Sequence, residues 1–84
     1  MQFFPNLLSR RTPVAIFQKT LVRASEIRTF EIEHDSDTGW QARVLANDCV
    51  AHEQRRTEWH RVERDVVRFT REIEALRRHG WRDA

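Results

Sequence analysis

The chain has 84 residues, a length that accommodates one small domain. It contains a single cysteine, so an intrachain disulfide is excluded, and no stretch approaches the roughly 20 apolar residues of a membrane-spanning helix. The N-terminus also lacks the apolar run of a secretory signal, so we expect a cytoplasmic protein without a membrane span. Charged residues make up 33% of the chain with both signs mixed, which is typical of a solvated surface.

The basic residues are unevenly distributed. Residues 1–25 contain four basic side chains and no acid, whereas residues 26–84 contain eleven arginines and thirteen acids. Both prolines also fall in the first part. We therefore interpret residues 1–25 as a basic, loosely ordered N-terminal arm with the composition of a transit peptide or a surface-binding segment. Within it, Val14, Phe17, Leu21 and Ala24 recur at helical spacing, so a short amphipathic helix is possible there.

Residues 26–84 are interpreted as a single β-β-(β)-α domain. Residues 27–34 alternate between apolar and polar side chains, with Phe30 and Ile32 on one face, which predicts a half-buried strand. A turn over residues 35–39 follows, where Gly39 permits a positive φ. Residues 40–46 predict the second strand, with Trp40 and Val44 on its apolar face.

A third strand is expected over residues 49–55, after a two-residue turn at Asn47 and Asp48. This register would place Cys49 and Ala51 on the buried face. The remainder of the segment is polar, so we expect an edge strand or a loop.

The C-terminal part predicts one long amphipathic helix. Its apolar positions are separated by alternating steps of three and four residues: Trp59, Val62, Val66, Phe69, Ile73 and Leu76. Thr57 is the expected N-cap. Gly80 is the expected residue after the C-cap, with Trp81 folding back on Leu76 as in a Schellman motif.

The fold class predicted by these elements is α+β, a small antiparallel β-meander of two to three strands followed by the helix. The expected core consists of the apolar faces of both: Phe30, Ile32, Trp40, Ala42, Val44, Ala46, Ala51, Trp59, Val62, Val66, Phe69, Ile73, Leu76 and Trp81.

The sequence gives little indication of catalysis. Cys49 and His52 have a spacing that resembles a metal pair, but on a strand they would face opposite sides, and zinc needs four converging ligands. A thiol on the buried face would behave as a small hydrophobe rather than as a nucleophile. The chain has only two glycines, so no glycine-rich phosphate loop is present. We expect neither an enzyme nor a metal, cofactor or small-molecule substrate.

The most specific surface feature is a ridge of four arginines on one helix face, Arg61, Arg64, Arg68 and Arg71. Asp65 and Glu72 are within reach and would partly neutralise it. The leading hypothesis is a non-enzymatic module that binds a protein partner and self-associates as a homodimer. The alternative is a nucleic-acid-binding accessory protein that uses the ridge and the N-terminal arm.

Overall fold

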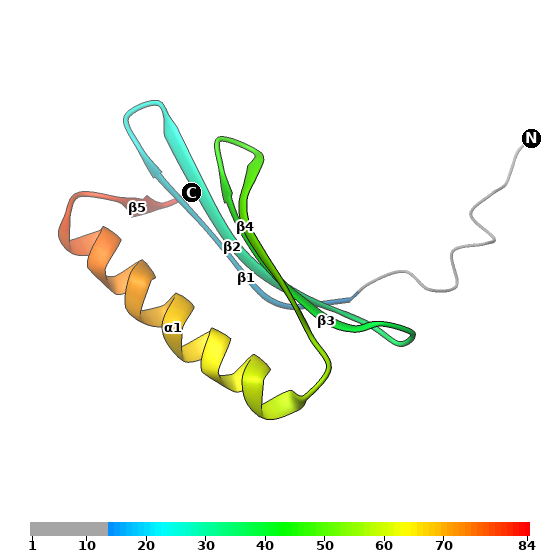
Figure 1. Cartoon of the computed structure of the whole chain (residues 1–84). Coiled ribbons are helices and arrows are strands. Elements are labelled where there is room, and N and C mark those ends of the chain that lie inside the picture. The colour runs from blue at the N-terminus through cyan, green and yellow to red at the C-terminus, as the bar shows by residue number, and fades with distance from the viewer. Residues whose placement is uncertain (1–13) are drawn as a thin grey trace, which may run out of the picture.

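The computed structural model describes residues 14–84 as one sheet and one helix (Figure 1). The elements in chain order are β1 (Val14–Arg23), β2 (Glu26–Asp35), β3 (Gly39–Ala46), β4 (Cys49–Arg56), α1 (Trp59–Arg78) and β5 (Arg82–Asp83). The strands form one antiparallel sheet in the order β4-β3-β2-β1-β5. The α+β class is confirmed, but the expected two to three strands are too few, because β1 and β5 were not predicted.

Strand β1 occupies residues that the sequence assigned to the arm and to a possible helix. In its ladder with β2, Ala15 lies opposite Glu33 and Phe17 lies opposite Ile32, so Ile16 is the extra residue of a β-bulge. The bulge changes the spacing of the inward-facing side chains, which makes Val14, Phe17 and Leu21 resemble a helical pattern. The arm prediction is therefore corrected over Val14–Arg23, and its residues 1–13 lie outside the described part of the chain.

Two turns of the meander have the predicted chemistry. Asn47 and Asp48 both have positive φ, 54° and 68°, as a two-residue turn of type I′ requires. The Asn47 side chain also accepts a hydrogen bond from the backbone N–H of Ile27 at 2.9 Å. Gly39 has a φ of 91°, and a Cβ there would lie 2.5 Å from the carbonyl oxygen of Arg56, so only glycine fits.

Helix α1 ends as predicted and begins one residue later than predicted. Gly80 has a φ of 94°, and the N–H of Trp81 donates to the carbonyl of Leu76 at 3.1 Å in a Schellman motif. The N-cap is Glu58 rather than Thr57, because the backbone is still extended at Glu58. Among the described residues, no side chain forms a capping hydrogen bond at the first turn.

The core lies between α1 and one face of the sheet, with Phe69 of α1 at its centre. The Phe69 ring lies 5.3 Å from that of Phe30 and 6.0 Å from that of Phe17, measured between centroids. The buried apolar side chains of the described chain are Leu21, Phe30, Ile32, Ala42, Val62, Phe69, Ile73 and Trp81. Leu21, on the unpredicted strand, is 0% exposed.

Trp40, Val44, Val66 and Leu76 are partly buried and pack against the core as expected, but three other expected residues do not belong to it. Ala51 and Trp59 are exposed and Ala46 is only half-buried. Ala46 and Ala51 belong to the β3–β4 hairpin, whose tip projects away from the helix (Figure 1). Trp59 is at the first turn of α1, where its ring contacts that of Trp40 at a tilt of 55° with 5.6 Å between centroids.

The C-terminus is anchored to β1. The guanidinium groups of Arg23 and Arg28 each lie over the ring of Trp81, 5.1 Å from its centroid. In β5, the Asp83 carboxylate accepts hydrogen bonds from Arg77 and Lys19, which lower the pKa of Asp83. These contacts complete the edge of the sheet beside β1.

We predict that Leu21→Ala lowers the free energy of unfolding by about 2–5 kcal/mol, because it opens a cavity beneath α1. Urea denaturation followed by circular dichroism measures this loss. The matched control is Val14→Ala on the same strand, where the side chain is 62% exposed and the change should stay within about 0.5 kcal/mol. Equal effects of the two substitutions would contradict the placement of β1 in the core.

Candidate functional site

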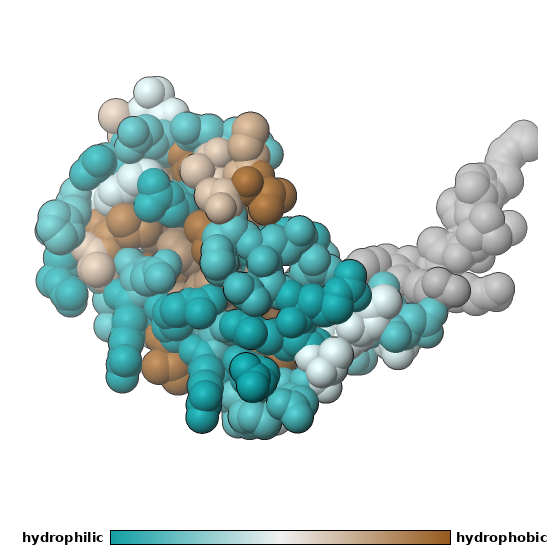
Figure 2. All heavy atoms as spheres, in the orientation of Figure 1, coloured by the Kyte–Doolittle hydropathy of each residue, from teal (hydrophilic) through white to brown (hydrophobic). Residues whose placement is uncertain are grey.

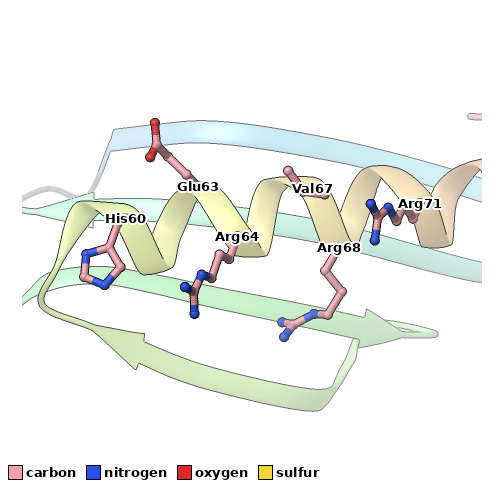
Figure 3. Close-up of a pocket in the computed structure, with 6 residues that line it drawn as sticks. All are labelled: His60, Glu63, Arg64, Val67, Arg68 and Arg71. Atoms are coloured by element: carbon pink, nitrogen blue, oxygen red, sulfur yellow. The ribbon is translucent and has the colours of Figure 1, made fainter.

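The solvent face of α1 contains an open hollow lined by arginine side chains. Its volume is about 500 Å³, and its lining residues all come from α1: His60, Glu63, Arg64, Val67, Arg68 and Arg71 (Figure 3). Three of the four predicted ridge residues are therefore brought together. The fourth, Arg61, is not part of the lining, and its Nε lies 3.3 Å from Oε1 of Glu58 instead.

The arginines of this hollow differ in their partners. Arg64 and Arg71 form no ion pair within residues 14–84, whereas Arg68 lies 3.1 Å from the Asp65 carboxylate. Between them, the Val67 side chain is 49% exposed. The hollow therefore offers two guanidinium groups with no carboxylate partner among the described residues, beside an apolar side chain, an arrangement that can bind an anionic or partly apolar ligand.

Asp65 is the buried charged residue of the described chain, with 1% exposure. Arg56 at the end of β4 binds it bidentately, with Nε at 2.9 Å from Oδ2 and Nη2 at 3.0 Å from Oδ1. The hydrogen bond to Asp65 is the main cause of the raised pKa of Arg56. This ion pair connects the first half of α1 to the edge strand of the sheet.

The sequence interpretation placed Asp65 on the surface, as a neutraliser of the ridge. The signal for its real position was present, because Asp65 follows Val62 by three residues and precedes Phe69 by four, which puts it on the apolar stripe. A carboxylate on a buried helix face needs a charged partner, and the arginine pair at the end of β4 was the nearest candidate.

On the opposite face of the sheet, Arg43 lies at the centre of three carboxylates. Its Nε donates to Glu31 at 2.9 Å, its Nη1 donates to Glu53 at 3.3 Å, and its Nη2 contacts Glu33. Partial burial opposes the charged form of Arg43, but the hydrogen bond to Glu31 and the charge of Glu33 outweigh it and raise the pKa. One cation among three anions leaves this group, which we call the Arg43 cluster, with excess negative charge.

Strand β4 forms one edge of the sheet, which confirms the third predicted strand. Its outer side pairs with no other strand in residues 14–84. Hydrophobic atoms gather at the tip of the β3–β4 hairpin (Figure 2), where Cys49, Val50 and Ala51 are all exposed. Cys49 was expected on the buried face, and the correction follows from the distance of this tip from α1.

Further along the strand, Arg55 is exposed and has no ion-pair partner within residues 14–84. In the β3–β4 ladder it lies opposite Gln41, whereas Glu53 lies opposite Arg43. The two residues therefore occupy the same face of the same open edge with opposite charges.

Two kinds of site are not found in residues 14–84. No group of three or more His, Cys, Asp and Glu side chains there could hold a metal ion, and none of the described helices is long and apolar enough to cross a membrane. Comparison with known proteins gives no match to a family model, to a curated protein or to a solved structure. A functional proposal must therefore rest on the surfaces described above.

We predict that Asp65→Ala lowers the free energy of unfolding by about 3 kcal/mol, because it leaves the guanidinium of Arg56 partly buried without its partner. Chemical denaturation measures the change. Glu58→Ala, which removes an exposed pair with Arg61, is the control and should cost less than about 1 kcal/mol. Similar losses for both variants would show that the buried pair has no special role.

Proposed function

We propose that the chain is a small, non-enzymatic protein-interaction module that self-associates through the outer edge of β4. The observation that carries this proposal is the edge itself, eight residues long with no strand on its outer side in the described chain. The backbone N–H and C=O groups along such an edge can pair with a strand from another molecule.

The other edge of the sheet is less suited to pairing. There β5 lies against β1 at Leu21 and Val22, and the N–H of Ala84 donates to the carbonyl of Thr20 at 3.0 Å. The remaining part of β1 is residues 14–19, and the bulge at Ile16 leaves only residues 17–19 of it in a regular ladder, whereas β4 keeps residues 52–56 regular beyond its own bulge at Ala51. The outer side of β4 is therefore the longer uncovered edge within residues 14–84.

The size of the fold also favours association. One helix and a small sheet bury a limited core, and domains of this size commonly gain stability from a partner. Addition of a second copy at β4 would join two sheets into one without disturbing the contacts of α1 with β1, β2 and β3. It would also bring the exposed side chains at the β3–β4 hairpin close to the second copy.

We predict a dimer in size-exclusion chromatography with light scattering on the full chain. Hydrogen–deuterium exchange above and below the dissociation constant locates the contact, because amides of Cys49–Arg56 should gain protection on dimerisation. Amides of Val14–Arg23 serve as the internal control and should not change. A monomer at all concentrations, or protection confined to another element, would contradict the proposal.

A second candidate function is nucleic-acid binding, which the arginine hollow on α1 supports. Arg64 and Arg71 have no ion-pair partner among residues 14–84 and lie about 10 Å apart along the helix axis, a distance that can span neighbouring phosphates. Residues 14–84 contain thirteen basic and thirteen acidic side chains, so binding would depend on this local surface rather than on overall charge.

For this candidate we predict that the double variant Arg64→Glu and Arg71→Glu abolishes low-salt binding to a fluorescent oligonucleotide. For the native chain, the logarithm of the association constant should fall as the logarithm of the salt concentration rises. Each of these two arginines should contribute about one unit to that negative slope. Arg82→Glu, at an exposed β5 position without an ion pair in the described part of the chain, is the charge-matched control for one reversal and should retain most of the affinity. Undetectable binding of the native chain at low salt would remove this candidate.

A further inference from the structure

We propose that two copies of this chain pair their β4 strands antiparallel about Gln54, so that Glu53 of each copy lies opposite Arg55 of the other. This inference rests on the proposed self-association and specifies its register. It follows from three features of the edge: the position of a bulge, the alternation of faces, and the order of charges.

The bulge limits where a regular ladder can form. In the pairing of β4 with β3, Val44 lies opposite His52 but Leu45 lies opposite Val50, so Ala51 is the extra residue. The regular part of the strand therefore consists of residues 52–56. A second β4 strand that adds to this edge finds five consecutive positions with undisturbed geometry.

The alternation of faces limits the register. A twofold axis perpendicular to the sheet keeps each side chain on its own face, and directly opposed residues of an antiparallel pair share a face. A residue can therefore lie opposite itself or opposite a residue an even number of positions away. Within residues 52–56, only a pairing centred on Gln54 matches all five positions.

The charges select the same register. A pairing centred on Glu53 would oppose two glutamates, and one centred on Arg55 would oppose two arginines, and both arrangements are unfavourable. The pairing centred on Gln54 opposes Glu53 and Arg55 twice, once on each side of the axis. On the other face it opposes His52 to Arg56, whose charge is already compensated by Asp65.

The Arg43 cluster gives a second reason for this arrangement. Glu53 belongs to a group of three carboxylates that share one guanidinium, whereas Arg55 has no ion pair in the described part of its own chain. In the proposed register, Arg55 of the second copy joins this group and reduces its excess negative charge. Each copy thus supplies the cation that the other lacks.

Space is available for the second strand. On the helix side of the sheet, a hollow of about 370 Å³ separates α1 from the edge, lined by Val44, His52, Arg68, Phe69 and Glu72. No residue of β4 is fully buried by α1. Side chains of a second β4 strand can therefore approach this side without displacing the helix.

The first test uses opposite charge reversals at the two positions. Arg55→Glu alone and Glu53→Arg alone each oppose like charges twice in their own homodimers, so each should weaken self-association about tenfold. A mixture of the two variants restores both opposite-charge pairs, and native mass spectrometry should then detect mainly the mixed dimer. Formation of the mixed dimer also shows that both variants are folded.

The second test uses cysteine cross-linking in a Cys49→Ser background. Gln54→Cys should form a disulfide-linked dimer under mild oxidation, because position 54 lies opposite itself. His52→Cys is the control on the same face, and it should not cross-link, because the two copies of position 52 would be about 14 Å apart.

The outcomes separate this register from the proposed function. If the native chain is a monomer, both the self-association and the register are wrong. If the native chain is a dimer that neither charge reversal weakens, or if His52→Cys cross-links in preference to Gln54→Cys, the register is wrong and the self-association stands.

Discussion

The described structure depends on a difference in width between helix α1 and the sheet that it covers. Strands lie about 4.8 Å apart, so the axes of β1 and β4 are separated by about 14 Å, whereas a helix with its side chains is about 10–12 Å across. Helix α1 covers β1, β2 and β3, from which Leu21, Phe30, Ile32 and Ala42 are buried. No residue of β4 is buried, and no second helix in residues 14–84 covers the opposite face of the sheet.

Beyond the apolar core, an ion pair connects α1 to β4. Asp65 extends from the buried side of α1 toward β4, and Arg56 meets it with two hydrogen bonds. Burial of two charges is costly, so such a pair contributes more to the choice of one arrangement than to overall stability. The bidentate geometry fixes the position of α1 relative to the edge strand, and Arg68 satisfies the carboxylate from the solvent side at 3.1 Å.

The sequence predicts those elements whose residue pattern matches the burial and backbone conformation that the fold imposes on them. Strands β2 and β3 show clean alternation, Asn47 and Asp48 form the expected turn, and Gly80 ends α1 as expected. Strand β1 was missed for two physical reasons. Its bulge at Ile16 replaces the period of two by a spacing that resembles a helix. The turn that follows it also places Ala24 at a φ of 54°, a conformation that alanine rarely adopts and that gives no turn signal.

The candidate surfaces were predictable to different degrees. Helical periodicity alone places Arg64, Arg68 and Arg71 together, and the structure confirms their proximity. Periodicity cannot show which of them is already engaged, because the partner of Arg68 depends on the position of Asp65 beneath the helix. The capacity of β4 to pair with another strand was harder still to predict from the sequence. It depends on which strand lies at the edge of the sheet and on which residues of that strand form a regular ladder.

Charge on an edge strand is usually regarded as a protection against indiscriminate pairing. On β4 the charges also discriminate between registers, because Glu53 and Arg55 occupy one face two positions apart with opposite signs. A strand without charges in this order would leave at least one of them without a counter-charge, and a copy shifted to a pairing centred on Glu53 or on Arg55 would oppose like charges. The charges of Glu53 and Arg55 would thus oppose pairing with unrelated strands and also favour the proposed pairing of two β4 strands. Repulsion in the other arrangements is what would make this pairing specific.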